Sequence, residues 1–242
     1  PKSTSTPRLK PNPTTKPTPT QRIVGAVRKK LGLRAKSGAT AALKKACAEF
    51  LTKFWKDGQL PMQDEWGRQG SPLVGYNTYP TTHSRLNKQL QLLNTLLVTT
   101  ELLPRVRACL PGFRIMEREL VRWLKQNFKT NVELFEAHGF RQAPWTGNAT
   151  NFAIHRDDEV YECIKYTVIV KLTSDEAGEA ASSMRVVGAP LDFEYGPQAG
   201  ASGCFRAGLF HASVEPRSKR EHLKIAFFFR RRRKQGKSTQ SV

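Results

Sequence analysis

The sequence predicts an α+β protein in which a helical region precedes a core of short strands. Apolar residues recur at three- and four-residue spacing over 38–56, 84–103 and 114–128, which is typical of amphipathic helices. From about residue 131 the period shifts towards two, and Gly, Pro and Ser turns separate short β-branched or aromatic runs. Several short strands in succession indicate an antiparallel sandwich, barrel or jelly roll.

The three helical stretches differ in their details. The first interleaves lysines with Ala42, Leu43, Ala46, Phe50 and Phe54, and the second repeats leucine until it meets Pro104. Proline cannot continue a helix interior, so we expect the second helix to end there. The third stretch reads "RIMERELVRWLKQNF". We interpret all three apolar stripes as packing surfaces.

Composition divides the chain into four segments. Residues 1–37 are rich in Pro, Thr, Ser and Lys, and we expect a disordered basic arm. Residues 38–130 form the helical support region, and 131–229 form the core. The segment 230–242 begins with four arginines and is predicted to be a basic tail. The predicted strands are "YTVIVKLT" (166–173), 184–188, 191–196, 203–214 and 222–229.

Charge and cysteine usage limit the partners and the compartment. The chain has 40 Lys and Arg against 20 Asp and Glu, a net charge of +20. Such a field predicts binding to a polyanion, with nucleic acid, DNA above all, as the first expectation. An acidic protein, a membrane surface or a merely soluble surface are the alternatives. No apolar run approaches the roughly 20 residues of a membrane span, and the N-terminus does not resemble a secretory signal. Four scattered cysteines fit a reducing intracellular compartment, and the basic runs suggest nuclear import.

One motif carries chemistry. His155 and Asp157 form an H-x-D sequence in "NFAIHRDDE", and His211 follows 54 residues after Asp157 in "GLFHASVEP". Two imidazoles and one carboxylate leave three positions open on a metal, as in the facial triad of non-haem Fe(II) oxygenases. The alternatives are a surface ion pair at His155 and Asp157, and a buried structural histidine at His211.

The order of features around this motif resembles the Fe(II)/2-oxoglutarate-dependent dioxygenases. In that family an H-x-D motif is followed, after a long segment, by a second histidine and then by Arg or Lys. Here Arg220 follows His211 by nine residues and opens "REHLKIAFFF". The resemblance covers about residues 140–229. It implies a double-stranded β-helix (jelly-roll) core, with His155, Asp157 and His211 as catalytic iron ligands.

The resemblance also implies cosubstrates. Arg220 would bind the distal carboxylate of 2-oxoglutarate as a pair of parallel hydrogen bonds. Neighbouring Arg217, Lys219 and Lys224 are competing cations, and His222 stands where the family has a small hydroxyl residue. Because some relatives use a different reductant, ascorbate is an additional expectation.

The expected reaction is oxidation of a C–H bond. Charge favours a nucleic-acid base, of the 5-methylcytosine or thymine type found in the TET/JBP-like branch, with AlkB-like demethylation next. A protein hydroxylase of prolyl type is the enzymatic alternative. From another class, a jelly-roll viral coat protein would package nucleic acid through its basic arm. In that case the three metal-binding side chains would not converge within about 4 Å of one point.

Overall fold

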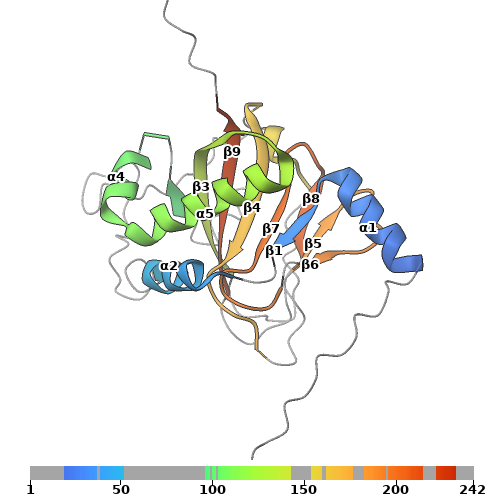
Figure 1. Cartoon of the computed structure of the whole chain (residues 1–242), viewed down its shortest axis with the longest axis horizontal. Coiled ribbons are helices and arrows are strands. Elements are labelled where there is room, and N and C mark those ends of the chain that lie inside the picture. The colour runs from blue at the N-terminus through green and yellow to red at the C-terminus, as the bar shows by residue number, and fades with distance from the viewer. Residues whose placement is uncertain are drawn as a thin grey trace, which may run out of the picture.

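Two antiparallel sheets form the framework of the chain (Figure 1). The computed structural model describes residues 19–36, 39–51, 96–98, 100–101, 103–142, 154–159, 162–176, 183–194, 196–214 and 222–232. The main sheet has the strand order β1-β7-β4-β9-β3-β2 and the minor sheet has the order β6-β5-β8. The described residues are therefore α+β, as predicted.

The strand bounds follow the apolar runs of the sequence. The main sheet contains β1 (Arg34–Lys36), β2 (Leu96–Val98), β3 (Val132–Gln142), β4 (Ile164–Lys171), β7 (Ser202–Arg206) and β9 (His222–Arg231). The minor sheet contains β5 (Ser183–Val186), β6 (Phe193–Glu194) and β8 (His211–Val214). The predicted strand at 203–214 is two strands, because residues 207–210 turn the chain from one sheet to the other.

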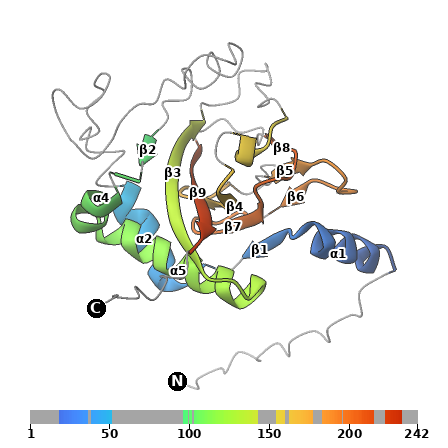
Figure 2. The same ribbon diagram turned by 90° about the horizontal axis from the view of Figure 1, so that it is seen from above.

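Helices cover the outer face of the main sheet (Figure 2). They are α2 (Ala41–Leu51), α4 (Leu103–Cys109) and α5 (Pro111–Phe128). Helix α2 begins where the Thr40 hydroxyl accepts a hydrogen bond from the Leu43 N–H (3.1 Å), and α5 begins with Pro111 at a position that needs no donor. Both pack on β4 and β9 through Phe50, Phe113, Met116, Leu120, Val168, Val170, Ile225 and Phe227. None of the described helices is long and apolar enough to span a membrane.

A second core lies between the two sheets. Phe205, Ile169 and Phe228 of the main sheet pack there against Met184 and Val186 of the minor sheet. Because side chains alternate along a strand, this inner face of β4 also carries Thr167 and Lys171. The register pairs Thr167 with Phe228, Ile169 with Ala226 and Lys171 with Lys224, so the inner face of β9 carries Lys224.

The expectation of disorder throughout residues 1–37 is wrong for residues 19–36. Pro19–Leu31 forms helix α1, and Leu33 and the partly buried Leu31 join the core between the sheets. Arg28 donates a hydrogen bond to the Asp192 carbonyl (3.1 Å) and stacks over the Phe193 ring, so α1 is fixed to the minor sheet. The Pro- and Thr-rich part of the arm, residues 1–18, lies outside the described residues.

Three other features differ from the prediction. Leu96–Val98 is strand β2 rather than helix, because it pairs with Ala137–Gly139 of β3. Pro104 lies in the first turn of α4, where a missing N–H costs nothing, so it begins a helix instead of ending one. The basic tail starts later than residue 230, because Arg230 and Arg231 belong to β9 and Arg230 binds Glu133 (2.7 Å).

Candidate metal centre

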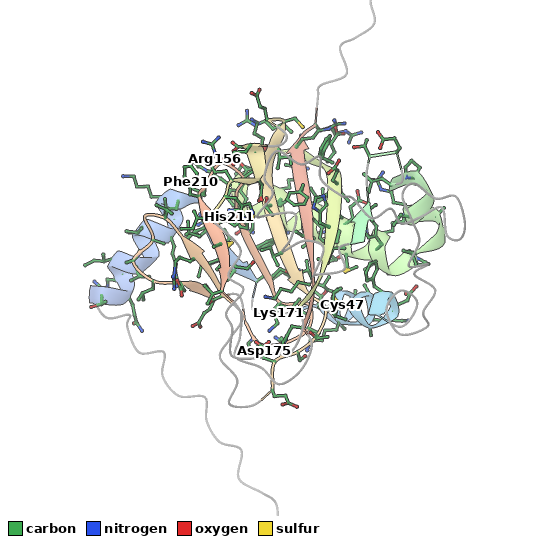
Figure 3. The ribbon with its side chains drawn as sticks, turned by 180° about the vertical axis from the view of Figure 1, so that it is seen from behind. Cys47, Arg156, Lys171, Asp175, Phe210 and His211 are labelled. Atoms are coloured by element: carbon green, nitrogen blue, oxygen red, sulfur yellow. The ribbon has the colours of Figure 1, made fainter. Side chains whose placement is uncertain are left out.

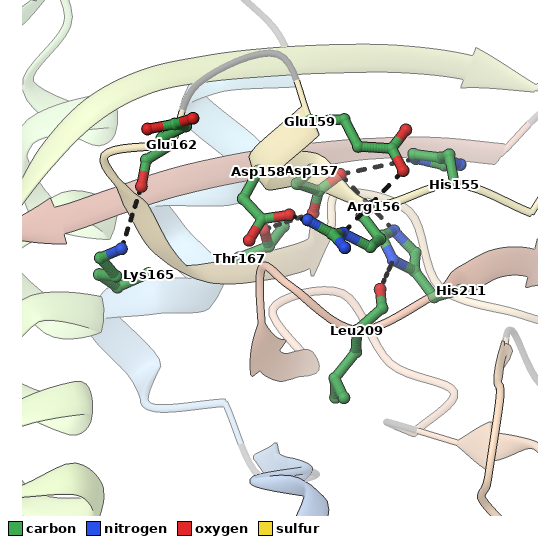
Figure 4. Close-up of polar contacts among 10 residues, drawn as sticks. All are labelled: His155, Arg156, Asp157, Asp158, Glu159, Glu162, Lys165, Thr167, Leu209 and His211. Atoms are coloured by element: carbon green, nitrogen blue, oxygen red, sulfur yellow. Dashed lines mark hydrogen bonds and ion pairs between the residues drawn. The ribbon is translucent and has the colours of Figure 1, made fainter.

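Backbone pairing between two distant segments places the two histidines. His155 forms an antiparallel bridge with His211, the first residue of β8. Each N–H donates to the other's carbonyl, at 3.0 Å from His155 and 2.9 Å from His211. Directly opposed residues in an antiparallel pair point to the same side. The two rings therefore meet, with centroids 4.5 Å apart (Figure 4).

Asp157 completes the group from a single turn of 3₁₀ helix, Asp157–Glu159. Its N–H donates to the Ala207 carbonyl (3.1 Å), just beyond β7. One carboxylate oxygen, Oδ1, lies 3.5 Å from His155 Nε2 and 3.6 Å from His211 Nε2. The three possible ligand atoms all lie within 4.8 Å of one another, so they converge on one point. Under the coat-protein alternative these three side chains would not converge, so their convergence argues against that alternative.

The protonation states suit metal binding. Burial alone would raise the pKa of Asp157, but the hydrogen bonds from His155 and Thr167 and the charge of His211 together hold it below its ordinary value. Burial lowers the pKa of His211 and outweighs the opposing attraction of Asp157. Asp157 is therefore a carboxylate at neutral pH, and His211 is a neutral imidazole.

Hydrogen bonds outside the triad fix which atoms face the centre. His211 Nδ1 lies 2.9 Å from the Leu209 carbonyl, and because a carbonyl only accepts, the ring proton is on Nδ1. The Nε2 lone pair is then available to a metal. Phe205 packs against the same ring, with centroids 4.4 Å apart, and limits its rotation. Two imidazoles and one carboxylate arranged in this way fit Fe(II).

Thr167 on β4 orients the carboxylate, because its hydroxyl donates a hydrogen bond of 2.5 Å to Asp157 Oδ2. We expect Thr167→Val, which keeps the shape but removes the donor, to weaken Fe(II) binding by about 10- to 100-fold. Thr167→Ser keeps the hydroxyl and is expected to retain the affinity. Anaerobic calorimetric titration of both variants checks this. Equal affinities for the two variants would show that the hydrogen bond does not act on the metal site.

On the outer side of the triad, a cation–π contact joins the segment that carries His155 to the segment that carries His211. The Arg156 guanidinium lies over the Phe210 ring, 5.4 Å from its centroid, and donates a hydrogen bond to Asp158 (2.9 Å). Arg156 and Phe210 each neighbour a histidine of the triad, and both lie beside His211 in Figure 3. A β-carbon at Gly208 would lie 2.9 Å from Asp158 Oδ2, so a larger residue there would require the Asp158 side chain to move.

Comparison with known proteins identifies the architecture. No protein-family model matches the sequence, and no curated protein matches it. A prolyl-4-hydroxylase from Pseudomonas putida superposes with a TM-score of 0.51 at 18% identity, over 87% of this chain and 100% of that one. EctD from S. alaskensis, solved with 2-oxoglutarate and 5-hydroxyectoine, gives 0.52 at 12% identity over 93% and 82%. The fold is that of the Fe(II)/2-oxoglutarate oxygenases.

A third solved structure has the same fold. The non-haem, alpha-ketoglutarate-dependent epimerase SnoN from nogalamycin biosynthesis superposes with a TM-score of 0.54 at 12% identity, over 86% of this chain and 81% of that one. These likenesses support the double-stranded β-helix as the core. They give no support to the TET/JBP-like branch.

The oxygenase fold also needs a cation for the oxo-acid. Arg220, the sequence candidate, lies outside the described residues, as do Arg217 and Lys219. The structure instead shows Lys171, fully buried at the end of β4, in an ion pair with Asp175. Its ammonium group also donates to the Pro197 carbonyl (3.1 Å). Sequence reasoning missed this residue, although a lysine within the β-branched run "YTVIVKLT" was a signal.

The environment of Lys171 is rich in titratable groups. Lys224 lies directly opposite on β9, and His222 Nδ1 is 3.5 Å from Asp175 Oδ1. All four of these side chains are buried. Like charges opposite each other on neighbouring strands are unfavourable, and the buried Asp175 carboxylate offsets the charge of Lys171. In Figure 3 Lys171 and Asp175 lie towards the opposite end of the strands from Arg156 and Phe210.

Proposed function

We propose that the protein is an Fe(II)- and 2-oxoglutarate-dependent hydroxylase of a C–H bond. The observation that carries this proposal is the convergence of His155, Asp157 and His211 within an oxygenase fold. With iron bound, such a site couples the conversion of 2-oxoglutarate and dioxygen to succinate and carbon dioxide with the insertion of one oxygen atom into the substrate C–H bond. The protein's own residues hold the reactants in position.

Each residue has a specific task in this proposal. His155, Asp157 and His211 would hold the metal, and Thr167 and the Leu209 carbonyl fix the direction of two of these ligands. Three protein ligands would leave positions on the metal for 2-oxoglutarate and dioxygen. Phe205 packs against the His211 ring and keeps it in place.

Lys171 would bind the distal carboxylate of 2-oxoglutarate. It lies on the same inner face as Thr167 and four residues further along β4, a separation of about 13 Å between Cα atoms. The lysine stem and the five-carbon acid together can cover this length.

Two observations bear on the substrate class, and they favour different substrates. The prolyl-4-hydroxylase likeness, which covers all of that enzyme's chain, favours a protein substrate of prolyl type over a nucleic-acid base. The net charge of +20 favours a nucleic-acid base, which is the second candidate. An enzyme of the second kind would have to extrude the base from its stack.

A coupled assay tests the activity and separates the substrates. The protein is incubated with Fe(II) and 2-oxoglutarate, with and without ascorbate, together with either a proline-rich peptide or a methylated oligonucleotide. We expect succinate release that rises with the peptide and a peptide heavier by one oxygen atom. The variant His155→Ala serves as the inactive control. Oxidation of the oligonucleotide alone would favour the second candidate, and metal-independent succinate release would contradict the oxygenase proposal.

A further inference from the structure

The strand ends of the main sheet gather positive charge at one end of the molecule. β7 ends at Arg206, which pairs with Tyr166 near the start of β4, and β9 ends at Arg231, which pairs with Val132 at the start of β3. These ends therefore lie together, at the top of the sheet in Figure 1, where β9 ends. We call this region the basic end; its exposed cations are Lys30, Lys129, Lys165, Arg206, Arg231 and Arg232.

Helix α1 adds to the same region. A β-carbon at Gly32 would lie 3.1 Å from Arg206 Nε, so the residue that follows α1 lies beside the Arg206 side chain of β7. The acidic groups near it are Glu133, which is paired with Arg230, Glu162 in the turn before β4, and Asp158 and Glu159, which are paired with Arg156. The excess positive charge is therefore fixed on rigid strand and helix ends.

The basic end adjoins the metal centre through backbone hydrogen bonds. Ala207 follows Arg206 directly; its carbonyl accepts from the Asp157 N–H (3.1 Å), and its N–H donates to the Lys165 carbonyl (3.2 Å). The backbone of Asp157 is therefore hydrogen-bonded to Ala207, which lies next to Arg206 and is itself hydrogen-bonded to Lys165. A polyanion bound at the basic end would lie beside the proposed iron site.

We propose that the basic end binds the phosphodiester backbone of nucleic acid. A protein partner would need apolar or aromatic anchors, which dominate the centres of protein interfaces. The exposed large hydrophobic residues of the described chain are Ile23, Ile154, Val187, Leu191 and Phe210, and none belongs to the basic end. Phosphate recognition requires only Lys and Arg with free access to solvent.

This inference is independent of the substrate proposed above. Nucleic acid at the basic end could itself be hydroxylated, or it could bring the enzyme to a protein that is bound to the same strand. The binding test below contains neither iron nor 2-oxoglutarate. Its failure therefore leaves the oxygenase proposal intact, and failure of the coupled assay leaves this one intact.

The test compares two charge-matched double variants of the full chain. Lys165→Gln/Arg206→Gln removes two cations from the basic end, and Lys44→Gln/Lys45→Gln removes two exposed cations from α2. Both keep the arm and the tail, so their contribution cancels. Affinity for a labelled single-stranded oligonucleotide is measured by fluorescence anisotropy over a salt series, and thermal unfolding verifies that both variants fold.

We expect the first variant to bind about 10-fold more weakly and to lose about 1.4 from the slope of log affinity against log salt, because each phosphate contact contributes about 0.7. The α2 variant should bind as wild type does. Equal weakening in both variants would overturn the proposal, because it would mean that only net charge matters. Displacement by poly-glutamate as effective as displacement by unlabelled oligonucleotide would also overturn it and would indicate an acidic protein partner.

Discussion

His211→Ala is expected to weaken Fe(II) binding by at least about 100-fold, and to abolish succinate release. His211 supplies one of three converging ligand atoms, and a direct ligand must contribute no less than the groups that merely orient ligands. The measurement is anaerobic titration with Fe(II), followed by the coupled assay. Affinity within a few-fold of wild type would refute the assignment of His211 as a ligand.

The control for this prediction is another buried histidine. His138 lies on β3, its ring packs edge-on against Phe228, and its Nε2 is 3.3 Å from Glu136. His138→Ala removes a similar buried volume without removing a proposed ligand. We expect His138→Ala to lower the thermal stability while leaving the affinity for Fe(II) near that of wild type. Loss of metal binding in both variants would instead indicate general unfolding.

Lys171→Met is expected to lower the free energy of unfolding by about 3–5 kcal/mol, because it removes the ammonium partner of the buried Asp175 carboxylate. The double variant Lys171→Met/Asp175→Leu replaces the whole pair with apolar groups, and should recover most of this stability. Chemical denaturation of both variants measures the two effects. As a reference, Arg107→Met breaks a more exposed ion pair with Glu117 and should cost about 1 kcal/mol or less.

The same double variant separates stability from cosubstrate binding. If Lys171 binds 2-oxoglutarate, the stable double variant still binds Fe(II) but has a KM for 2-oxoglutarate raised by about 10-fold or more, since a charge-assisted hydrogen bond is lost. If the double variant recovers both stability and the wild-type KM, Lys171 is only a structural residue, and a cation outside the described residues binds the oxo-acid.

The triad could be predicted because the spacing of its three residues is visible in the sequence. His155 and Asp157 are two residues apart, and His211 opens a strand, but the three side chains meet only through the bridge between His155 and His211 and the hydrogen bond from the Asp157 N–H to the Ala207 carbonyl. Lys171 was missed because its role depends on which face of β4 points between the sheets. That choice is made by packing against Met184 and Val186, which are distant in sequence.

The errors in the fold have the same origin. Leu96–Val98 has a leucine spacing that suits a helix, but pairing with β3 satisfies its backbone as a strand and outweighs that propensity. The composition of residues 19–36 resembles that of residues 1–18, for which the sequence also predicts disorder, yet Arg28 binds the Asp192 carbonyl and Leu33 joins the core between the sheets. In both cases tertiary contacts, which a local pattern does not contain, decided the structure.

The backbone bridge between His155 and His211 has a consequence for biosynthesis. The strands β4 to β7 lie between the two residues in sequence, so the bridge can close only after His211 has been synthesised, and such long-range contacts are slow to form. A nascent chain that has emerged only as far as β4 presents His155 and Asp157 without the third ligand. Iron loading is therefore a late event, and iron at about 100 times its dissociation constant would add about 2.7 kcal/mol to the finished fold. Metal binding would then be the last step that stabilises a newly made chain.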